Sequence, residues 1–224
     1  MSTENTTTAE QPAPSAVRSS DLLAGQLVTP YYDEGGVTIY CGDNRRIAPM
    51  LGDFDLLLTD PPYGLAEKSN GGSWGNFGSW DNSPPPPWTL GMMMEKARRQ
   101  IMWGGNYYQL PPSRGWLIWR KPLLPSCADA EMAWTNMDMN TRVFDESRNP
   151  DGKRDHPTQK PVSLMRWCLD QVPDAKTVLD PWMGSGTTLV AARAKGLRAV
   201  GIEINEQYCK AAVARLSQGV LLAC

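Results

Sequence analysis

The residues best suited to chemistry are Asp60-Pro61-Pro62-Tyr63, which directly follow the apolar run 56–59. Two prolines remove two backbone donors and stiffen the turn, so the Pro61 carbonyl becomes a rigid acceptor beside the Asp60 carboxylate. An exocyclic amine of adenine or cytosine is a poor nucleophile because its lone pair is delocalised. Two acceptors, one for each N–H, draw its nitrogen toward tetrahedral geometry. Tyr63 offers a flat ring for stacking on a base taken out of a duplex.

A second group of residues forms a Gly-rich turn between a predicted strand and a predicted helix, at positions 177–188. Such a turn lies where parallel strands bind ligands, and the N–H groups of the next helix can hold an anion. No lysine ends the turn as in a P-loop, and Leu189 stands where a dinucleotide site has its third glycine. Asp180 would repel pyrophosphate but suits an ammonium group. A ligand with both an ammonium and a carboxylate fits, such as the methionine half of S-adenosylmethionine.

The next predicted strand ends at Glu203. An acidic residue at that place can accept hydrogen bonds from both ribose hydroxyls of a nucleoside. Taken alone, the Gly-x-Gly turn at Gly184 and Gly186 is equally consistent with close packing and no ligand. Together with Asp180 and Glu203 it favours a nucleoside site.

With Asp60 ahead of Asp180, the chain resembles the amino-methyltransferases of DNA in their permuted β class, in which the catalytic motif precedes the cofactor motif. The resemblance covers about residues 37–216. Four further segments carry it: 103–108, 119–121, 133–135 and His156-Pro157-Thr158-Gln159-Lys160-Pro161. Trp182 departs from the pattern, because phenylalanine is usual there.

The resemblance implies a role for each motif position. Asp60 and Pro61 would hold the target amine, Pro62 would stiffen the turn, and Tyr63 would stack on the target base. Lys160 would flank the carboxylate end of S-adenosylmethionine. The residues expected to bind this cofactor are Asp43, Thr158, Gln159, Lys160, Asp180, Pro181, Gly184, Ser185, Gly186, Thr187 and Glu203.

Basic residues between the predicted elements are candidates for contact with DNA. Arg142, Arg148, Lys153 and Arg154 stand close together in the sequence. A run of this kind is commonly a solvated loop, but beside a base-flipping site phosphate contact is an equal alternative. They lie in a short segment, about 136–156, which would be a minimal target-recognition region.

Alternating apolar runs and helical stretches predict an α/β fold, a doubly wound and mostly parallel seven-stranded sheet of the Rossmann-like methyltransferase type. One antiparallel strand is expected near Glu131. The predicted strands are 37–41, 56–59, 100–103, 116–119, 131–134, 177–179 and 199–202.

Helices are predicted over 161–172, 187–195 and 206–216, with one more that carries Met92, Met93 and Met94. Lys96, Arg98 and Arg99 are also expected on a helix. The long segments 66–88 and 140–157 carry no predicted element. Residues 1–25 are expected to be a disordered tail, because they are polar and lack periodicity, and 26–224 a single domain.

Composition narrows the cellular setting and the partners. The net charge is −2, so any footprint on double-stranded DNA must be a local patch. No apolar run approaches the roughly 20 residues of a membrane span, and the first residues lack a secretory signal. We expect a cytoplasmic protein of bacterial or phage origin, without a metal site. The resemblance adds a homodimer and a cognate restriction enzyme as expected partners.

Several other activities compete with methylation of adenine N6. Methylation of cytosine N4 stays open, because the same acceptor pair would serve. Methylation of cytosine C5 is disfavoured, since no Pro-Cys dipeptide is present to supply a nucleophile. RNA or protein-glutamine methylation usually begins its motif with Asn rather than Asp. From another class, a catalytically idle module that binds DNA or nucleotides is the alternative.

Overall fold

A computed structural model describes residues 28–64, 83–121, 128–147 and 159–221. The expected tail at 1–25 lies outside these ranges, as does most of the segment 66–88. Four residues named as site candidates also lie outside them, Arg148, Lys153, Arg154 and Thr158, and so does the motif residue His156.

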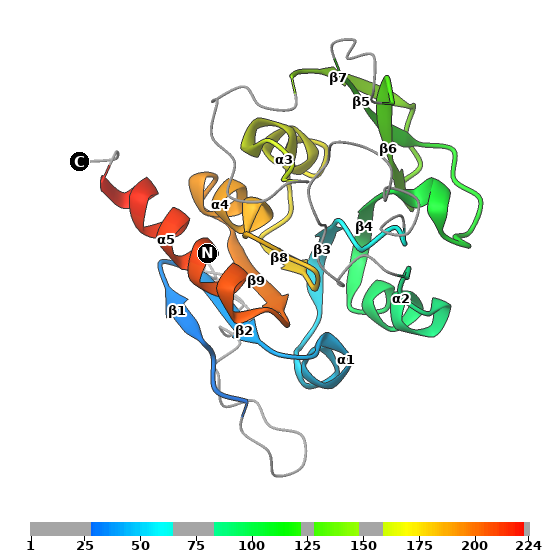
Figure 1. Cartoon of the computed structure of the whole chain (residues 1–224). Helices are drawn as coiled ribbons and strands as arrows, with labels where there is room; N and C mark the ends of the chain where they lie inside the picture. The colour runs from blue at the N-terminus through cyan, green and yellow to red at the C-terminus, as the bar shows by residue number, and fades with distance from the viewer. Residues whose placement is uncertain (1–27, 65–82, 122–127, 148–158, 222–224) are drawn as a thin grey trace, which may run out of the picture.

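A nine-stranded sheet forms the centre of the described structure, in the order β1-β2-β9-β8-β3-β4-β6-β5-β7 (Figure 1). β6 runs antiparallel to both β4 and β5, and β1 runs antiparallel to β2. The other described pairings are parallel. The strands are β1 Tyr32–Glu34, β2 Val37–Cys41, β3 Phe54–Thr59, β4 Ala97–Trp103, β5 Trp116–Arg120, β6 Ala130–Thr135, β7 Arg142–Asp145, β8 Thr177–Asp180 and β9 Arg198–Glu203.

The mostly parallel class and the antiparallel strand near Glu131 are confirmed, but the count of seven strands is wrong. β1 and β7 are the two additional strands, one at each edge of the sheet. β7 falls in the segment 140–157, for which no element was predicted. Its side chains are mostly exposed, so it carries no apolar run that would reveal a strand.

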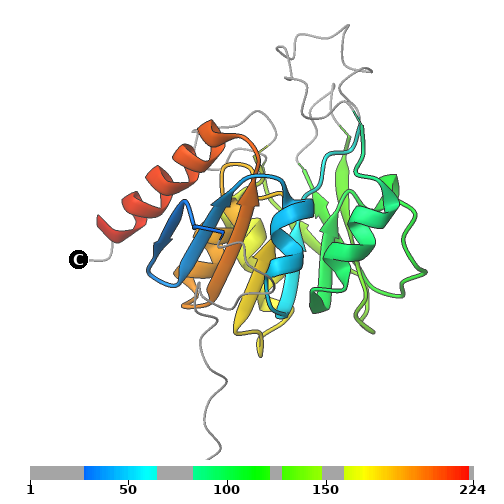
Figure 2. The same ribbon diagram turned by 90° about the horizontal axis from the view of Figure 1, so that it is seen from below.

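Helices cover both faces of the sheet (Figure 2). One core joins residues of α3, α4 and α5 to Leu56 and Leu58 of β3, whereas the other joins α1 and α2 to Leu57. Alternate residues of one strand thus enter opposite cores, as in a doubly wound sheet. No described helix is long and apolar enough to cross a membrane. The helices are α1 Asn44–Ile47, α2 Pro87–Met94, α3 Val162–Asp170, α4 Thr187–Ala194 and α5 Glu206–Leu221.

The boundary between α2 and β4 differs from the prediction. The helix that carries Met92, Met93 and Met94 is confirmed as α2, and Met93 is fully buried. The predicted helical placement of Lys96, Arg98 and Arg99 is wrong, because Lys96 lies in the turn after α2 and both arginines belong to β4. Arg99 pairs with Asp174 at the start of that strand, where charged side chains reach solvent.

The order in which the chain places its strands reverses between β3 and β8, which are hydrogen-bonded neighbours. From β3 the chain continues to β4 on one side, and from β8 it continues to β9 on the other. Ligands bind at the carboxyl ends of strands at such a switch point. The residues that follow β3 and end β8, Asp60 and Asp180, therefore meet at one edge.

Candidate active site

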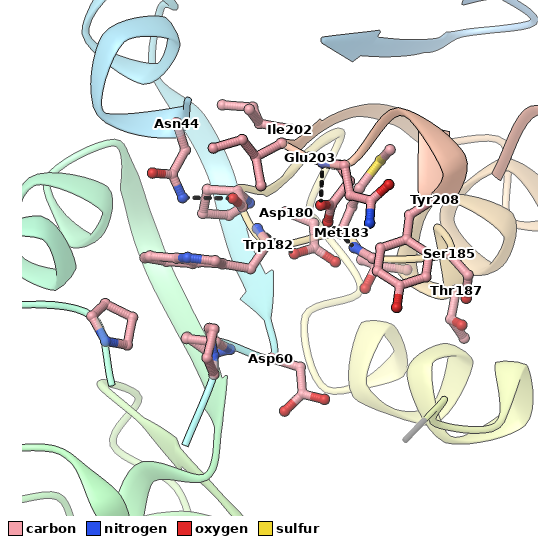
Figure 3. A pocket seen from close by; sticks show the side chains of 18 of the residues that line it. Asn44, Asp60, Asp180, Trp182, Met183, Ser185, Thr187, Ile202, Glu203 and Tyr208 are labelled. Atoms are coloured by element: carbon pink, nitrogen blue, oxygen red, sulfur yellow. Dashed lines mark hydrogen bonds between the residues drawn. The ribbon is translucent and has the colours of Figure 1, made fainter. Parts of the chain in front are cut away.

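A cavity of about 650 Å³ opens at this carboxyl edge (Figure 3). Its volume lies within the range of about 300–1,000 Å³ that is typical of small-molecule sites. Both predicted constellations line it. The predicted site residues on its wall are Asp43, Asp60, Pro61, Pro62, Tyr63, Gln159, Lys160, Asp180, Pro181, Gly184, Ser185, Thr187 and Glu203.

Asp60 is held by two donors of its own chain. The Tyr63 hydroxyl donates to Oδ1 over 2.5 Å, and the Lys160 ammonium donates to Oδ2. Burial raises the pKa of Asp60, and the charge of Lys160 acts against this rise. Each carboxylate oxygen can accept a second hydrogen bond. Asp60 is therefore anchored and still able to receive an N–H group.

The Pro61 carbonyl is held in the same way by Tyr108, which the sequence did not single out as a site residue. The Tyr108 hydroxyl donates to the Pro61 carbonyl over 2.7 Å and to the Pro62 carbonyl over 3.1 Å. A carbonyl oxygen has two lone pairs, so Pro61 can still accept from a ligand. Both acceptors of the turn are thus fixed by tyrosine hydroxyls.

The ring of Tyr63 lies within a small aromatic group. It stacks on Tyr107, with ring centroids 4.9 Å apart and planes 19° from parallel. Gly104 allows this approach, because a Cβ there would lie 2.1 Å from the Tyr63 ring. Tyr107 is 46% exposed and carries the solvent side of the pair. Stacking of Tyr63 on a target base stays a prediction.

The Gly-rich turn is fixed by α5. Gly186 has φ +77°, and a Cβ there would lie 2.7 Å from the Cβ of Ala212, so its role is close packing and it does not line the cavity. Arg215 donates to the Ser185 carbonyl over 2.8 Å and to the Thr187 hydroxyl over 3.0 Å. Gly184, with φ +53°, has nothing near its missing Cβ and leaves room at the cavity wall.

Two carboxylates suit the cationic and hydroxyl groups expected of the cofactor. Burial raises the pKa of Asp180 to about 6, and Thr59 donates to it over 2.7 Å. Glu203 accepts the Gly184 N–H over 3.1 Å and the Asn205 N–H over 2.8 Å, one on each oxygen. The backbone N–H of Ile204 also acts on this carboxylate, so one acceptor position of Glu203 remains for a ribose hydroxyl. These residues therefore fit an amino acid joined to a nucleoside.

The remaining predicted cofactor residues differ in what they contact. Asp43 caps α1 and is paired with Arg45 over 2.6 Å. Gln159 accepts from the Ser185 hydroxyl over 3.2 Å, beside the Gly-rich turn. Lys160 instead contacts Asp60, Tyr63 and Glu131, on the β3 side of the cavity.

Some residues on the cavity wall were not predicted from the sequence. Asn44 donates to the Pro181 carbonyl over 2.8 Å and follows Asp43 directly, so proximity in sequence could have suggested it. Glu131 was predicted only as part of a strand, and no residue near it in the sequence indicates its contact with Lys160. Tyr208 lines the cavity from α5.

Arg142 is the one predicted DNA contact within the described residues, and the structure does not bring it to the cavity. It is exposed at the start of β7, in register with Leu117 at the start of β5. Both strands run parallel to β3, so their starts lie at the edge opposite Asp60.

Comparison with known proteins identifies the family of the chain. A family model described as DNA methylase, of the N6/N4 methyltransferase type, matches residues 95–214. The type II methyltransferase M.ScaI of Streptomyces caespitosus is 25% identical over 262 residues, covering 85% of this chain and 84% of that protein. The putative methylase YubD of Escherichia coli K12 is 47% identical over 68 residues, which is 30% of each chain.

Solved structures show the same architecture. The M1.HpyAVI–SAM complex superimposes with a TM-score of 0.57 at 20% identity, over 80% of this chain and 98% of that one. The PvuII DNA methyltransferase, which is cytosine-N4-specific, gives 0.59 at 16% identity, over 83% and 88%. These likenesses carry the fold, and the family model covers more than half of the sequence. The chain therefore belongs to the N6/N4 DNA methylase family.

Proposed function

We propose that this protein transfers a methyl group from S-adenosylmethionine to N6 of adenine at a specific sequence in double-stranded DNA. The observation that carries the proposal is the meeting of two constellations in one cavity. The acceptors Asp60 and Pro61 follow β3, and the turn with Asp180 follows the adjacent strand β8.

Residues on the β8 and β9 side of the cavity would hold the cofactor. Asp180 pairs with the ammonium of the methionine part, and Glu203 accepts from the ribose hydroxyls. Asp43 and Asn44 would contact the adenine, and Gln159 would contact the carboxylate, for which Thr158 is also a proposed contact. When bound, S-adenosylmethionine supplies an electrophilic methyl group on sulfur.

Residues on the β3 side would prepare the nucleophile. The target amine donates one N–H to Asp60 and the other to the Pro61 carbonyl, which turns its lone pair toward the methyl group. Because the amine is inside the duplex, the base must first leave the stack. Fixed acceptors lower the cost of orienting the amine, and here Tyr63 and Tyr108 fix them.

The target base and the partners complete the proposal. Asp60 at the head of the motif favours adenine, whereas cytosine N4 remains the second candidate because the PvuII enzyme with the same fold is cytosine-N4-specific. Similarity to a type II methyltransferase supports a cognate restriction enzyme and a bacterial or phage setting in the cytoplasm. Arg148, Lys153 and Arg154 are proposed phosphate contacts, and a homodimer is the proposed assembly.

The first test is transfer of an isotopically labelled methyl group from S-adenosylmethionine to unmodified genomic DNA. After digestion to nucleosides, mass spectrometry should find the label in N6-methyladenine. Label in N4-methylcytosine would establish the second candidate instead. Cofactor binding without transfer to DNA would contradict the enzyme and favour an idle binding module.

The matched variant is Asp60→Ala. It removes one acceptor of the target amine but no proposed cofactor contact. We expect transfer to fall by a factor of about 100 or more, while the calorimetric Kd for S-adenosylmethionine stays near that of the wild type. Retained transfer would refute the role of Asp60.

A further inference from the structure

Behind Asp60 lies a chain of alternating charges that the proposed reaction does not by itself require. Lys160 contacts Asp60 and, over 3.3 Å, Glu131. Lys121 contacts the other oxygen of Glu131 over 2.8 Å. The order is therefore Asp60, Lys160, Glu131, Lys121, which we call the charge chain.

The charge chain joins four separate segments of the protein. Asp60 follows β3, Lys121 follows β5, Glu131 lies in β6, and Lys160 precedes α3. The two lysine side chains are only 4% and 6% exposed. A buried ammonium is costly unless carboxylates surround it, and here Glu131 serves both lysines. Burial would raise the pKa of Glu131, but Lys160 and Lys121 outweigh it and lower that pKa to about 2.

Lys160 has no donor left over for a cofactor. An ammonium has three N–H donors, and three oxygens surround this one: Asp60 Oδ2, Glu131 Oε2 and Tyr63 Oη, the last at 3.0 Å. The placement expected from the family resemblance, at the carboxylate end of S-adenosylmethionine, would require at least one of these contacts to break.

We infer that Lys160 is a positioning residue that holds the Asp60 carboxylate in place as the acceptor for the target amine. Glu131 holds Lys160, and Lys121 in turn holds Glu131. This inference rests on the proposed function. It assigns Glu131 and Lys121, which lie outside the motifs for cofactor and catalysis, to the same task. A displacement of about 1 Å at such an acceptor can cost a factor of about 100 in rate.

The charge of Lys160 also matters for the ionisation of Asp60. Burial raises the pKa of Asp60, Glu131 raises it further by repulsion, and Lys160 and Tyr63 lower it. Asp180 lines the same cavity, and the charge of Asp60 adds to the rise in the pKa of Asp180 that burial causes. A protonated Asp60 is a poorer acceptor. Loss of Lys160 should therefore raise the pH at which transfer begins.

The test compares Lys160→Met, Glu131→Gln and the double variant with the wild type. Lys195→Met is the matched control, since this lysine pairs with Asp170 away from the cavity. Transfer of labelled methyl to DNA is measured under single-turnover conditions as a function of pH. The Kd for S-adenosylmethionine is measured by calorimetry, which also reports that each variant is folded.

We expect Lys160→Met to reduce transfer by about 100-fold, to move the acid limb of the pH profile upward, and to leave the Kd for S-adenosylmethionine near the wild-type value. Glu131→Gln should reduce transfer less. The double variant should be no worse than Lys160→Met alone, because Glu131 acts through Lys160.

Two results would overturn the inference while the wild type remains active. One is a weaker Kd for the cofactor as the main effect of Lys160→Met, which would return this lysine to the cofactor. The other is a loss of transfer in the double variant that equals the product of the losses in the two single variants, together with a pH profile of Lys160→Met that matches the wild type. A wild type that transfers no methyl group would instead refute the proposed function.

Discussion

At the scale of single residues, the cavity is notable for negative charge that the protein does not neutralise itself. Within the described residues, Asp180 and Glu203 have hydrogen-bond donors but no ion-pair partner. Asp60, by contrast, has Lys160. The two carboxylates without an ion-pair partner lie on the side of the β8 turn, so their charge favours a cationic group there over an anionic one.

The raised pKa of Asp180 predicts how cofactor affinity depends on pH. With a value of about 6, Asp180 is ionised above this pH and loses its charge as the pH falls through it. An ammonium ligand binds the ionised form, so we expect the calorimetric Kd for S-adenosylmethionine to rise steadily from pH 7 down to pH 5.

The variant Asp180→Asn provides the control for this prediction. It should bind the cofactor weakly at every pH, and with a much flatter profile between pH 5 and pH 7. A wild-type profile as flat as that of the variant would show that Asp180 does not receive the ammonium.

At the scale of elements, α5 stabilises the conformation of the Gly-rich turn. The turn has two glycines with positive φ, but only Gly186 is pressed against α5, where Ala212 lies at 2.7 Å from the position of a Cβ. Arg215 adds hydrogen bonds from α5 to Ser185 and Thr187. The turn is therefore held from outside the cavity, by a helix that comes 20 or more residues later in the chain.

This packing predicts different costs for two similar substitutions. Gly184→Ala and Gly186→Ala both place a side chain at positive φ, which costs about 1 kcal/mol or more. Gly186→Ala must also displace α5, so it should lower the free energy of unfolding by about 1–3 kcal/mol beyond the loss for Gly184→Ala. Urea denaturation measures both. Equal losses would mean that α5 yields without strain.

Most elements could be predicted because buried strands are apolar and helices are periodic. β3, for example, is predicted from the buried run Leu56, Leu57 and Leu58. β7 was missed because an exposed edge strand needs no apolar residue, and the start of β4 was misassigned because its charged residues reach solvent. The charge chain could not be foreseen, since no local pattern links Glu131 to Lys160.

At the scale of the whole molecule, the two ends of the parallel strands carry different residues. The carboxyl edge carries the cavity, whereas Arg142 lies at the opposite edge, beside a second, polar cavity with Arg98, Arg99 and Asp174. The net charge of −2 provides no general attraction to DNA, so DNA must be bound by a local group of basic residues on the protein.

This arrangement predicts that the basic candidates are not equivalent. Arg142→Ala should leave the affinity for DNA unchanged, because that residue is on the far edge from the target base. Arg154→Ala should weaken DNA binding for all sequences and reduce the salt dependence by about one unit of slope. Fluorescence anisotropy at several salt concentrations measures both. A loss of DNA affinity in Arg142→Ala would mean that DNA also contacts the end of the sheet where the parallel strands begin.

The pairing of β3 with β8 has a consequence for how the protein is made. Asp60, the proposed acceptor of the target amine, follows β3, but the neighbouring strand β8 and its other partner β9 are synthesised much later. Such long-range pairing forms late and slowly in folding. A nascent or truncated chain that ends before β8 has half a site, so DNA in the cell would meet the activity only in finished molecules.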